Sequence, residues 1–138
     1  MQTKERQQKV IKPPSKPGEW TLRQVEDVIS RPLPGSMLGT CKQGGKEITF
    51  IPWHVVNSVL SKYAPGWQFQ ITKLEKTENR LFLVGRLSIP TADGLVSRDA
   101  TGTEQLDTKF SDPSSKAESM AFRRASARFG LGLYLYST

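Results

Sequence analysis

Hydrophobic residues recur every three or four positions in three separate stretches of this chain. This spacing predicts helices over residues 21–30, 52–64 and 113–129, because side chains three and four apart share one helix face. The first and last of these stretches also carry residues suited to helix ends. These residues are Thr21, Gln24, Asp112, Pro113 and Gly130.

Between the second and third predicted helices the pattern changes to alternation with a period of two. Residues 67–74 and 80–89 alternate cleanly, and residues 95–101 do so with weaker hydrophobicity. Turn residues at 78–79 and 91–94 separate these stretches. The pattern therefore predicts three consecutive antiparallel strands, followed by a polar loop before the last helix.

A shorter two-stranded unit is predicted between the first two helices. Residues 37–41 and 47–51 have strand character, and Gly44 and Gly45 lie between them, which indicates a hairpin. The order helix, hairpin, helix, three strands, helix predicts an α+β fold, with a curved antiparallel sheet and the helices on one face.

The first eighteen residues have a different character. Residues 1–18 are polar, basic and interrupted by Pro13, Pro14 and Pro17, so we expect a flexible basic arm. Residues 19–138 are predicted to form one domain.

Three arginines lie close together near the end of the last predicted helix. Arg124 and Arg128 are four residues apart and share a face, while Arg123 lies about 100° round the helix from Arg124. Such closely spaced guanidinium groups repel one another unless an anion or an acidic neighbour is present. A polyanion is therefore the expected partner of this helix.

The overall charge agrees with that expectation. The chain has 20 Lys and Arg against 13 Asp and Glu, a net charge of +7 and a pI of about 9.8, which favours nucleic acid or an anionic membrane surface as partner. A soluble domain with a merely solvated basic face is the alternative. The single cysteine, Cys41, forms no internal disulfide, and no stretch has the length and hydrophobicity of a secretory signal or a membrane span. We expect a cytoplasmic, nucleoid-associated protein without a membrane partner.

Enzyme chemistry finds little support in the residues. His54 is the only histidine, and with one cysteine the chain has no His/Cys zinc set. The stretch GTCKQGGKE lacks the spacing and the hydroxyl residue of a phosphate-binding loop. The acids between residues 93 and 107 lack the spacing of a calcium loop, so solvated turn residues are the better account. We therefore expect no enzyme, no metal, no cofactor and no small-molecule substrate, and the scattered acids disfavour a nuclease.

Further basic residues are spread over the hairpin and the strands. None of the common sequence-reading motifs accompanies them, so sequence-independent contact with phosphates is expected. These basic residues are Lys42, Lys46, Lys73, Lys76, Arg80, Arg86 and Arg98.

The aromatic residues of the periodic segments are predicted to pack in the core, and base stacking is the weaker alternative. They are Trp67, Phe69, Phe82 and Phe129. The apolar terminal segment GLYLY, with Tyr134 and Tyr136, is predicted to be a strand that pairs with a neighbouring subunit.

The run KAESMAFRRASARFGLGLYLY resembles the end of the annealing domain of the Rad fifty-two family, in which a helix carries a basic pair, Ala and then Phe-Gly. The segment ITFIPWHVVN, followed by Tyr63 and Gly66-Trp67, resembles that family's strand-helix-strand entry, and DATGTE loosely resembles another of its stretches. Together these segments run from about residue 21 to residue 136.

The resemblance implies a β-β-β-α core, a homo-oligomeric ring or short helix, and single-stranded DNA in a basic groove. It further implies ATP-independent annealing of complementary strands in recombination and repair, by a protein of prokaryotic or phage type. Arg123 and Arg124 match the family's basic pair. His54 stands where an arginine is usual, and Ala127 where many members carry a further arginine. Mediator activity through a long tail is not expected.

The predicted DNA-binding residues follow from the arginine helix and the basic segments around it. They are Arg123, Arg124, Arg128, Lys116, His54, Lys46 and Arg98. A module like a double-stranded RNA-binding domain is the second reading, because it too combines three antiparallel strands with a basic C-terminal helix. Docking of an acidic protein partner on the basic surface is the third.

Overall fold

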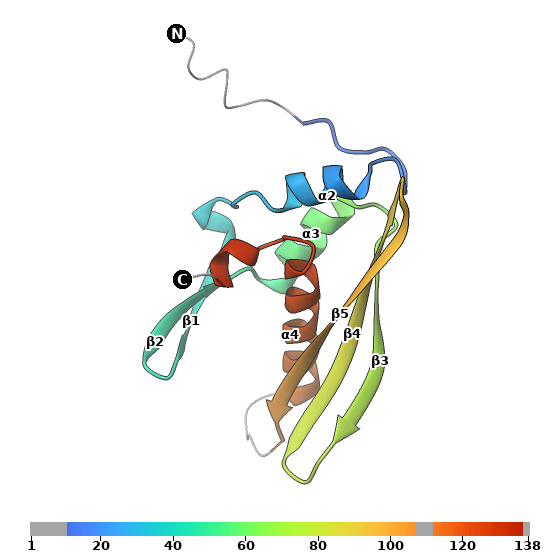
Figure 1. Ribbon diagram of the computed structural model, residues 1–138. Helices are drawn as coiled ribbons and strands as arrows, with labels where there is room; N and C mark the ends of the chain where they lie inside the picture. The colour runs from blue at the N-terminus through green and yellow to red at the C-terminus, as the bar shows by residue number, and fades with distance from the viewer. Residues whose placement is uncertain (1–10, 107–111, 137–138) are drawn as a thin grey trace.

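The computed structural model describes residues 11–106 and 112–136, and the α+β class predicted from the sequence is confirmed. Three α-helices, two short 3₁₀ turns and five strands make up this part of the chain (Figure 1). In chain order they are α2 (Leu22–Ile29), η1 (Gly35–Met37), β1 (Gly39–Gln43), β2 (Lys46–Phe50), α3 (Trp53–Tyr63), β3 (Gln68–Lys76), β4 (Arg80–Thr91), β5 (Gly94–Gln105), α4 (Pro113–Ala127) and η2 (Leu133–Tyr136).

Strands β3, β4 and β5 form an antiparallel sheet in that order, with β4 in the middle. Along β4 buried and more exposed residues alternate, so one face of the sheet is covered and the other is open. Gly85 allows the Phe69 ring of β3 to cross over β4, because a Cβ at this position would lie 2.2 Å from the ring. The register shifts between Ile71 and Lys73, which indicates a bulge in the edge strand.

Helix α4 lies along the covered face of this sheet. The contact with β5 is close, since a Cβ on Gly102 would lie 1.8 Å from the backbone oxygen of Ala117. Helices α2 and α3 pack at one end of the same face, where Ile29, Leu60 and Leu87 meet Phe129 in the main core. The helices therefore share one face of the sheet, as the sequence predicted.

The helix ends use the residues expected of them. Thr21 caps α2, with its side chain accepting from the Gln24 N–H while the Gln24 side chain accepts from the Thr21 N–H. Asp112 caps α4 by accepting from the Ser115 N–H, and Pro113 opens that helix. Gly130 follows α4 with a φ of 106°, a conformation that L-residues rarely adopt. Among the described helices, none has the length and the hydrophobicity needed to cross a membrane.

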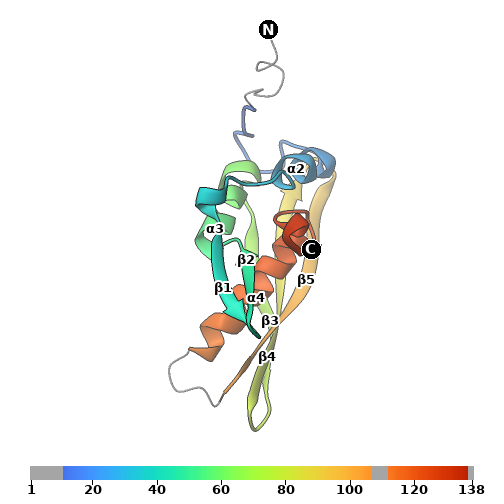
Figure 2. The same ribbon diagram turned by 90° about the vertical axis from the view of Figure 1, so that its left-hand side faces the viewer.

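The β1–β2 hairpin is separate from the large sheet. Seen from two sides, α4 lies between the hairpin and the three-stranded sheet (Figures 1 and 2). The end of η2 lies beside the base of the hairpin, near the C-terminal end of α4. This arrangement places the arginine part of α4 next to both of these elements.

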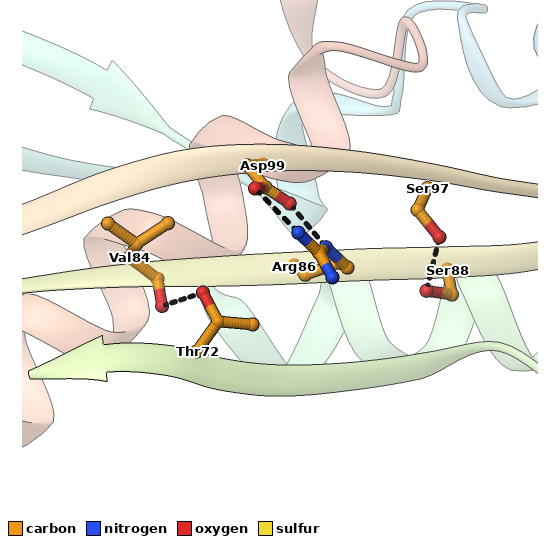
Figure 3. Close-up of polar contacts among 6 residues, drawn as sticks. All are labelled: Thr72, Val84, Arg86, Ser88, Ser97 and Asp99. Atoms are coloured by element: carbon orange, nitrogen blue, oxygen red, sulfur yellow. Dashed lines mark hydrogen bonds and ion pairs between the residues drawn. The ribbon is translucent and has the colours of Figure 1, made fainter.

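Polar side chains pair across β4 and β5 on the open face of the three-stranded sheet (Figure 3). Arg86 on β4 forms two hydrogen bonds with the Asp99 carboxylate on β5, at 2.8 and 3.2 Å. Next along the same strands, the hydroxyls of Ser88 and Ser97 lie 2.7 Å apart. Cross-strand pairs of this kind join β4 to β5 on the side away from α4.

Several details differ from the sequence-based expectations. Strand β5 continues to Gln105, where a loop was expected, because its backbone pairs with β4 as far as Arg80. The terminal segment is the 3₁₀ turn η2 and not a strand, since glycines with positive φ at 130 and 132 turn the chain. Phe82 lies on the open face of the sheet and is 36% exposed, so it is not a core residue.

The predicted flexible arm is only partly within the described chain. Residues 11–18 run against the domain: Pro14 is buried, and a Cβ on Gly66 would lie 2.8 Å from Pro17. The Ser15 N–H and hydroxyl both donate to the Glu19 carboxylate. This stretch therefore contacts the domain at Pro14 and Pro17, while Lys12, Ser15 and Lys16 are exposed. Residues 1–10 lie outside the described residues.

Candidate nucleic-acid interface

A hollow lies between the β1–β2 hairpin, the C-terminal half of α4 and η2, and we call it the hairpin hollow. Its wall combines apolar hairpin residues with two of the three predicted arginines. The residues used below are Gln43, Phe50, Met120, Arg123, Arg124 and Tyr136. Strand β2 leads into α3 through the buried Ile51, so the hairpin is anchored to the core at its base.

A second hollow lies on the other side of Arg124, between the end of α4, β5 and η2, and we call it the terminal hollow. Arg124 and Arg128 both line it, as their spacing of one helical turn predicted. Leu133 and Tyr136 of η2 form its opposite side. Arg124 and Tyr136 line both hollows, so the two adjoin at this pair of residues.

Arg123 is the most enclosed of the three arginines. Its guanidinium lies over the Phe50 ring, 5.4 Å from the ring centroid, in a cation–π contact. Burial lowers the pKa of Arg123 below its usual value, the positive charge of Arg124 acts in the same direction, and Tyr136 and Cys41 act in the opposite one. Within residues 11–106 and 112–136 no hydrogen bond or salt bridge joins its side chain to another group.

An arginine stays protonated at physiological pH even where burial disfavours its charge. Arg123 is therefore a half-buried cation whose donors have no acceptor in the described part of the protein. Such a group is stabilised when an anion enters the hollow beside it, because hydrogen bonds to charged acceptors strengthen away from water.

Arg124 and Arg128 are both exposed, and they differ in the hydrogen bonds that their groups form. Arg124 donates to the backbone oxygen of Thr101 on β5 at 3.2 Å, which leaves its other donors open to the hollows. Arg128 ends α4, and its backbone oxygen accepts from Arg98. Neither guanidinium forms a salt bridge with a carboxylate of the described residues.

The acids near these arginines are already paired with other cations. Asp99 borders the terminal hollow, but it is held by Arg86, whose hydrogen bond lowers the pKa of that carboxyl. Glu26 is held by Arg98 at 2.8 Å. Among the residues that the structure describes, no carboxylate therefore forms a salt bridge with Arg123, Arg124 or Arg128.

Arg98, predicted from the sequence to contact DNA, has a different position from the other arginines. Its guanidinium donates to Glu26 and to the backbone oxygen of Arg128, and lies 4.4 Å from the Phe129 ring centroid. These contacts join β5 to α2 and to the end of α4. The side chain borders the terminal hollow, but one guanidinium nitrogen is engaged twice within the protein, by Glu26 and by the Arg128 backbone oxygen.

Three further predicted residues lie outside the two hollows. Lys46 is at the hairpin tip, opposite Gln43, so it stands at the rim of the hairpin hollow. Lys116 is exposed two turns before Arg124, about 12 Å along the helix axis. His54 is exposed in the first turn of α3, with its ring edge-on to Trp53 at 6.1 Å. The structure thus places the arginines beside η2, whereas Lys46, Lys116 and His54 lie outside the two hollows.

Two residues of the interface were not predicted as site residues. Phe50 was read only as part of a strand, and Tyr136 only as part of an oligomer contact. The available signal was the position of the aromatic residues in GLYLY directly after an arginine helix. This position indicates a role in the site only because η2 folds back beside α4 in the tertiary structure.

Comparison with known proteins agrees with the resemblance noted in the sequence. A protein named DNA repair RAD52-like protein 1, mitochondrial, from Arabidopsis thaliana is 36% identical over 118 residues, which cover 83% of this chain and 67% of that protein. DNA repair RAD52-like protein 2, chloroplastic, from the same plant is 48% identical over 89 residues, covering 63% of this chain and 45% of that protein. No protein-family model matches the chain.

The chain belongs to the RAD52-like family. The predicted resemblance to the Rad fifty-two family is thereby confirmed at the level of the family, whereas the narrower prokaryotic or phage type stays a prediction.

The expected cytoplasmic, nucleoid-associated location is contradicted by these comparisons. Both relatives carry the name of an organelle, the mitochondrion for one and the chloroplast for the other. The expectation rested on charge, cysteine content and the absence of a membrane segment. These properties follow from how the domain folds and binds, and a domain of this kind can have them in any of these compartments.

Proposed function

We propose that this protein binds single-stranded DNA without sequence preference and anneals complementary strands, without ATP, in DNA repair and recombination. The observation that carries the proposal is the cluster of Arg123, Arg124 and Arg128 around two adjoining hollows. The relatives support it, because both are named as DNA repair proteins.

In this proposal the arginines bind the phosphate backbone. A guanidinium presents parallel donors that match two phosphate oxygens, and it remains charged under all physiological conditions. Contacts to phosphate set affinity and register but carry no sequence information. A strand held by its backbone leaves base edges free to test pairing with a second strand.

The proposed activity makes and breaks no covalent bond. Neutralising the backbone charge of two strands lowers their mutual repulsion, and this allows pairing registers to be sampled. No catalytic residue and no nucleotide are needed for that step, so we expect the protein to act by binding alone.

We also propose that the active form is a homo-oligomer. Strand β3 is an edge of the large sheet and exposes Ile71 and Leu74, the latter to 62%. Exposed apolar residues along an unpaired strand edge favour association with another chain. An oligomer would convert many weak phosphate contacts along one strand into effectively intramolecular ones.

The test is annealing of two complementary oligonucleotides without nucleotide, with binding and particle mass recorded on the same sample. We expect faster annealing by particles larger than the monomer. Competition with duplex RNA and with an acidic polypeptide provides the contrast. Preference for duplex RNA would favour the double-stranded RNA-binding reading, and preference for the polypeptide would favour a protein-docking surface; either result would overturn the proposal.

A further inference from the structure

Tyr136 occupies the place where the two hollows adjoin. Its side chain lines the hairpin hollow together with Arg123 and the terminal hollow together with Arg128, and Arg124 borders both. It is 58% exposed, so its ring is not a core group. A large aromatic ring is thus open to solvent at the same hollows that the three arginines line.

A backbone turn after α4 brings this residue to the two hollows. Gly130 and Gly132 have φ values of 106° and 75°, which turn the chain back after α4. The hydrogen bonds from Leu133 N–H to Gly130 O and from Leu135 N–H to Gly132 O then close η2.

The neighbours of Tyr136 on η2 face the protein. The Tyr134 hydroxyl accepts from the Leu33 N–H at 3.1 Å, and Leu135 packs against the main core. Two inward contacts on successive residues hold the turn, so the backbone of η2 places Tyr136 at the rim of both hollows.

A nucleotide offers two groups that this arrangement fits together. Its phosphate is an anion for the guanidinium groups, and its base is a flat ring that extends to one side of the backbone. Base stacking on an exposed aromatic ring is favourable and tolerates every base, because every base has a π-face. A tyrosine within a cluster of phosphate-binding arginines therefore lies within reach of a base of the same strand.

We propose that the ring of Tyr136 is a stacking platform for one base of the bound single strand. The inference rests on the proposed function and deepens it, since it divides the site into a backbone-binding part and a base-contacting part. The arginines bind by charge, whereas Tyr136 binds without charge and without selecting among the four bases.

The test compares Tyr136→Ala with Tyr136→Phe and Tyr136→Leu on a labelled oligothymidine. We expect the alanine variant to bind about 5- to 150-fold more weakly, the range expected for loss of one stacked base. The phenylalanine variant keeps the ring and should bind like the wild type. The leucine variant keeps bulk without the ring and should bind weakly, which separates stacking from packing if the alanine variant fails to fold.

Two controls identify the base as the group contacted. On an abasic oligonucleotide of the same length the wild type and the alanine variant should bind equally. Leu95→Ala removes an apolar side chain of β5 that is 69% exposed and lies outside both hollows, and should leave affinity within about twofold. The slope of log affinity against log salt should be the same for Tyr136→Ala and the wild type, because no charge is lost.

Equal affinity of wild type and Tyr136→Ala for oligothymidine, or an equal loss on the abasic strand, would overturn the stacking inference while leaving the proposed function intact. A wild type that binds no single-stranded DNA would instead remove the proposed function itself. The two failures are therefore distinguished by the wild-type curve alone.

Discussion

Arg98 on β5 donates one hydrogen bond to the Glu26 carboxylate at 2.8 Å, and the same guanidinium nitrogen donates to the backbone oxygen of Arg128 at 2.7 Å. This residue therefore ties the sheet to α2 and to the end of the arginine helix. A basic residue beside a proposed DNA site thus serves the fold, and its removal should affect stability more than binding.

We expect Arg98→Ala to lower the free energy of unfolding by about 2 kcal/mol, because hydrogen bonds to a charged group and a cation–π contact with Phe129 are lost together. Urea denaturation measures this. Affinity for single-stranded DNA, recorded well below the melting temperature, should change less than in the Arg123 and Arg124 variants. A large loss of affinity with unchanged stability would contradict this assignment and restore Arg98 to the DNA site.

Replacing Arg123 and Arg124 by alanine together should weaken binding to every sequence by a similar factor. Loss of two phosphate contacts on a single strand lowers the slope of log affinity against log salt by about 1.4. Binding titrations at several salt concentrations measure both quantities.

The matched control for the double variant is Lys73→Ala with Arg80→Ala. These two side chains lie on the large sheet, outside both hollows, where they contact Glu75 and Thr103. Net charge changes equally in the two variants, so an equal loss of affinity would mean that overall charge, and not the arginine cluster, binds the DNA.

Gly102→Ala should be among the most destabilising single substitutions in the described chain. Its Cβ would clash with the Ala117 backbone oxygen, and the other nearest atoms are also backbone atoms of α4, so no flexible side chain can move aside. Overpacking of this kind costs about 1–3 kcal/mol or more. Gly35→Ala is the control, because nothing lies within 4 Å of its added Cβ and its φ is not positive. Equal stability of the two variants in urea would contradict the close packing of α4 on β5.

The stability supplied by the Asp112 cap should depend on pH. The Ser115 N–H, then the Ser115 and Ser114 hydroxyls, lower the pKa of this carboxyl below its usual value. The cap therefore stabilises the fold fully above the unfolded-state pKa of about 3.9 and loses this effect as pH falls through the lower folded-state value.

Thermal melts of the wild type, Asp112→Ala and Asp112→Asn measure this dependence. The melting temperature of the alanine variant should be lower than that of the wild type at pH 7, and the difference should shrink below about pH 4. Asparagine is also a good cap and does not titrate, so its advantage over alanine should stay constant with pH. A gap between wild type and alanine that is constant down to pH 2 would contradict the role of the carboxylate.

Much of the fold could be predicted from local pattern. The capping box of Thr21 and Gln24, the hairpin around Gly44 and Gly45, and the meander of β3, β4 and β5 follow from residues that are neighbours in the chain. The continuation of β5 through Gly102 to Gln105 could not be predicted this way, because these residues are polar or small. They are held as a strand by pairing with β4 and by the approach of α4.

The candidate site, too, could be predicted from the sequence only in part. By itself the sequence determined the helical spacing of Arg123, Arg124 and Arg128 and the excess of positive charge, because both depend on residue identity and on helix geometry alone. Only the tertiary structure decided that Arg98 is engaged by Glu26, that Phe50 lies under Arg123, and that Tyr136 stands between the two hollows. These relationships join segments that are far apart in the chain, and a partner brought close by folding leaves no periodic trace in the sequence around it.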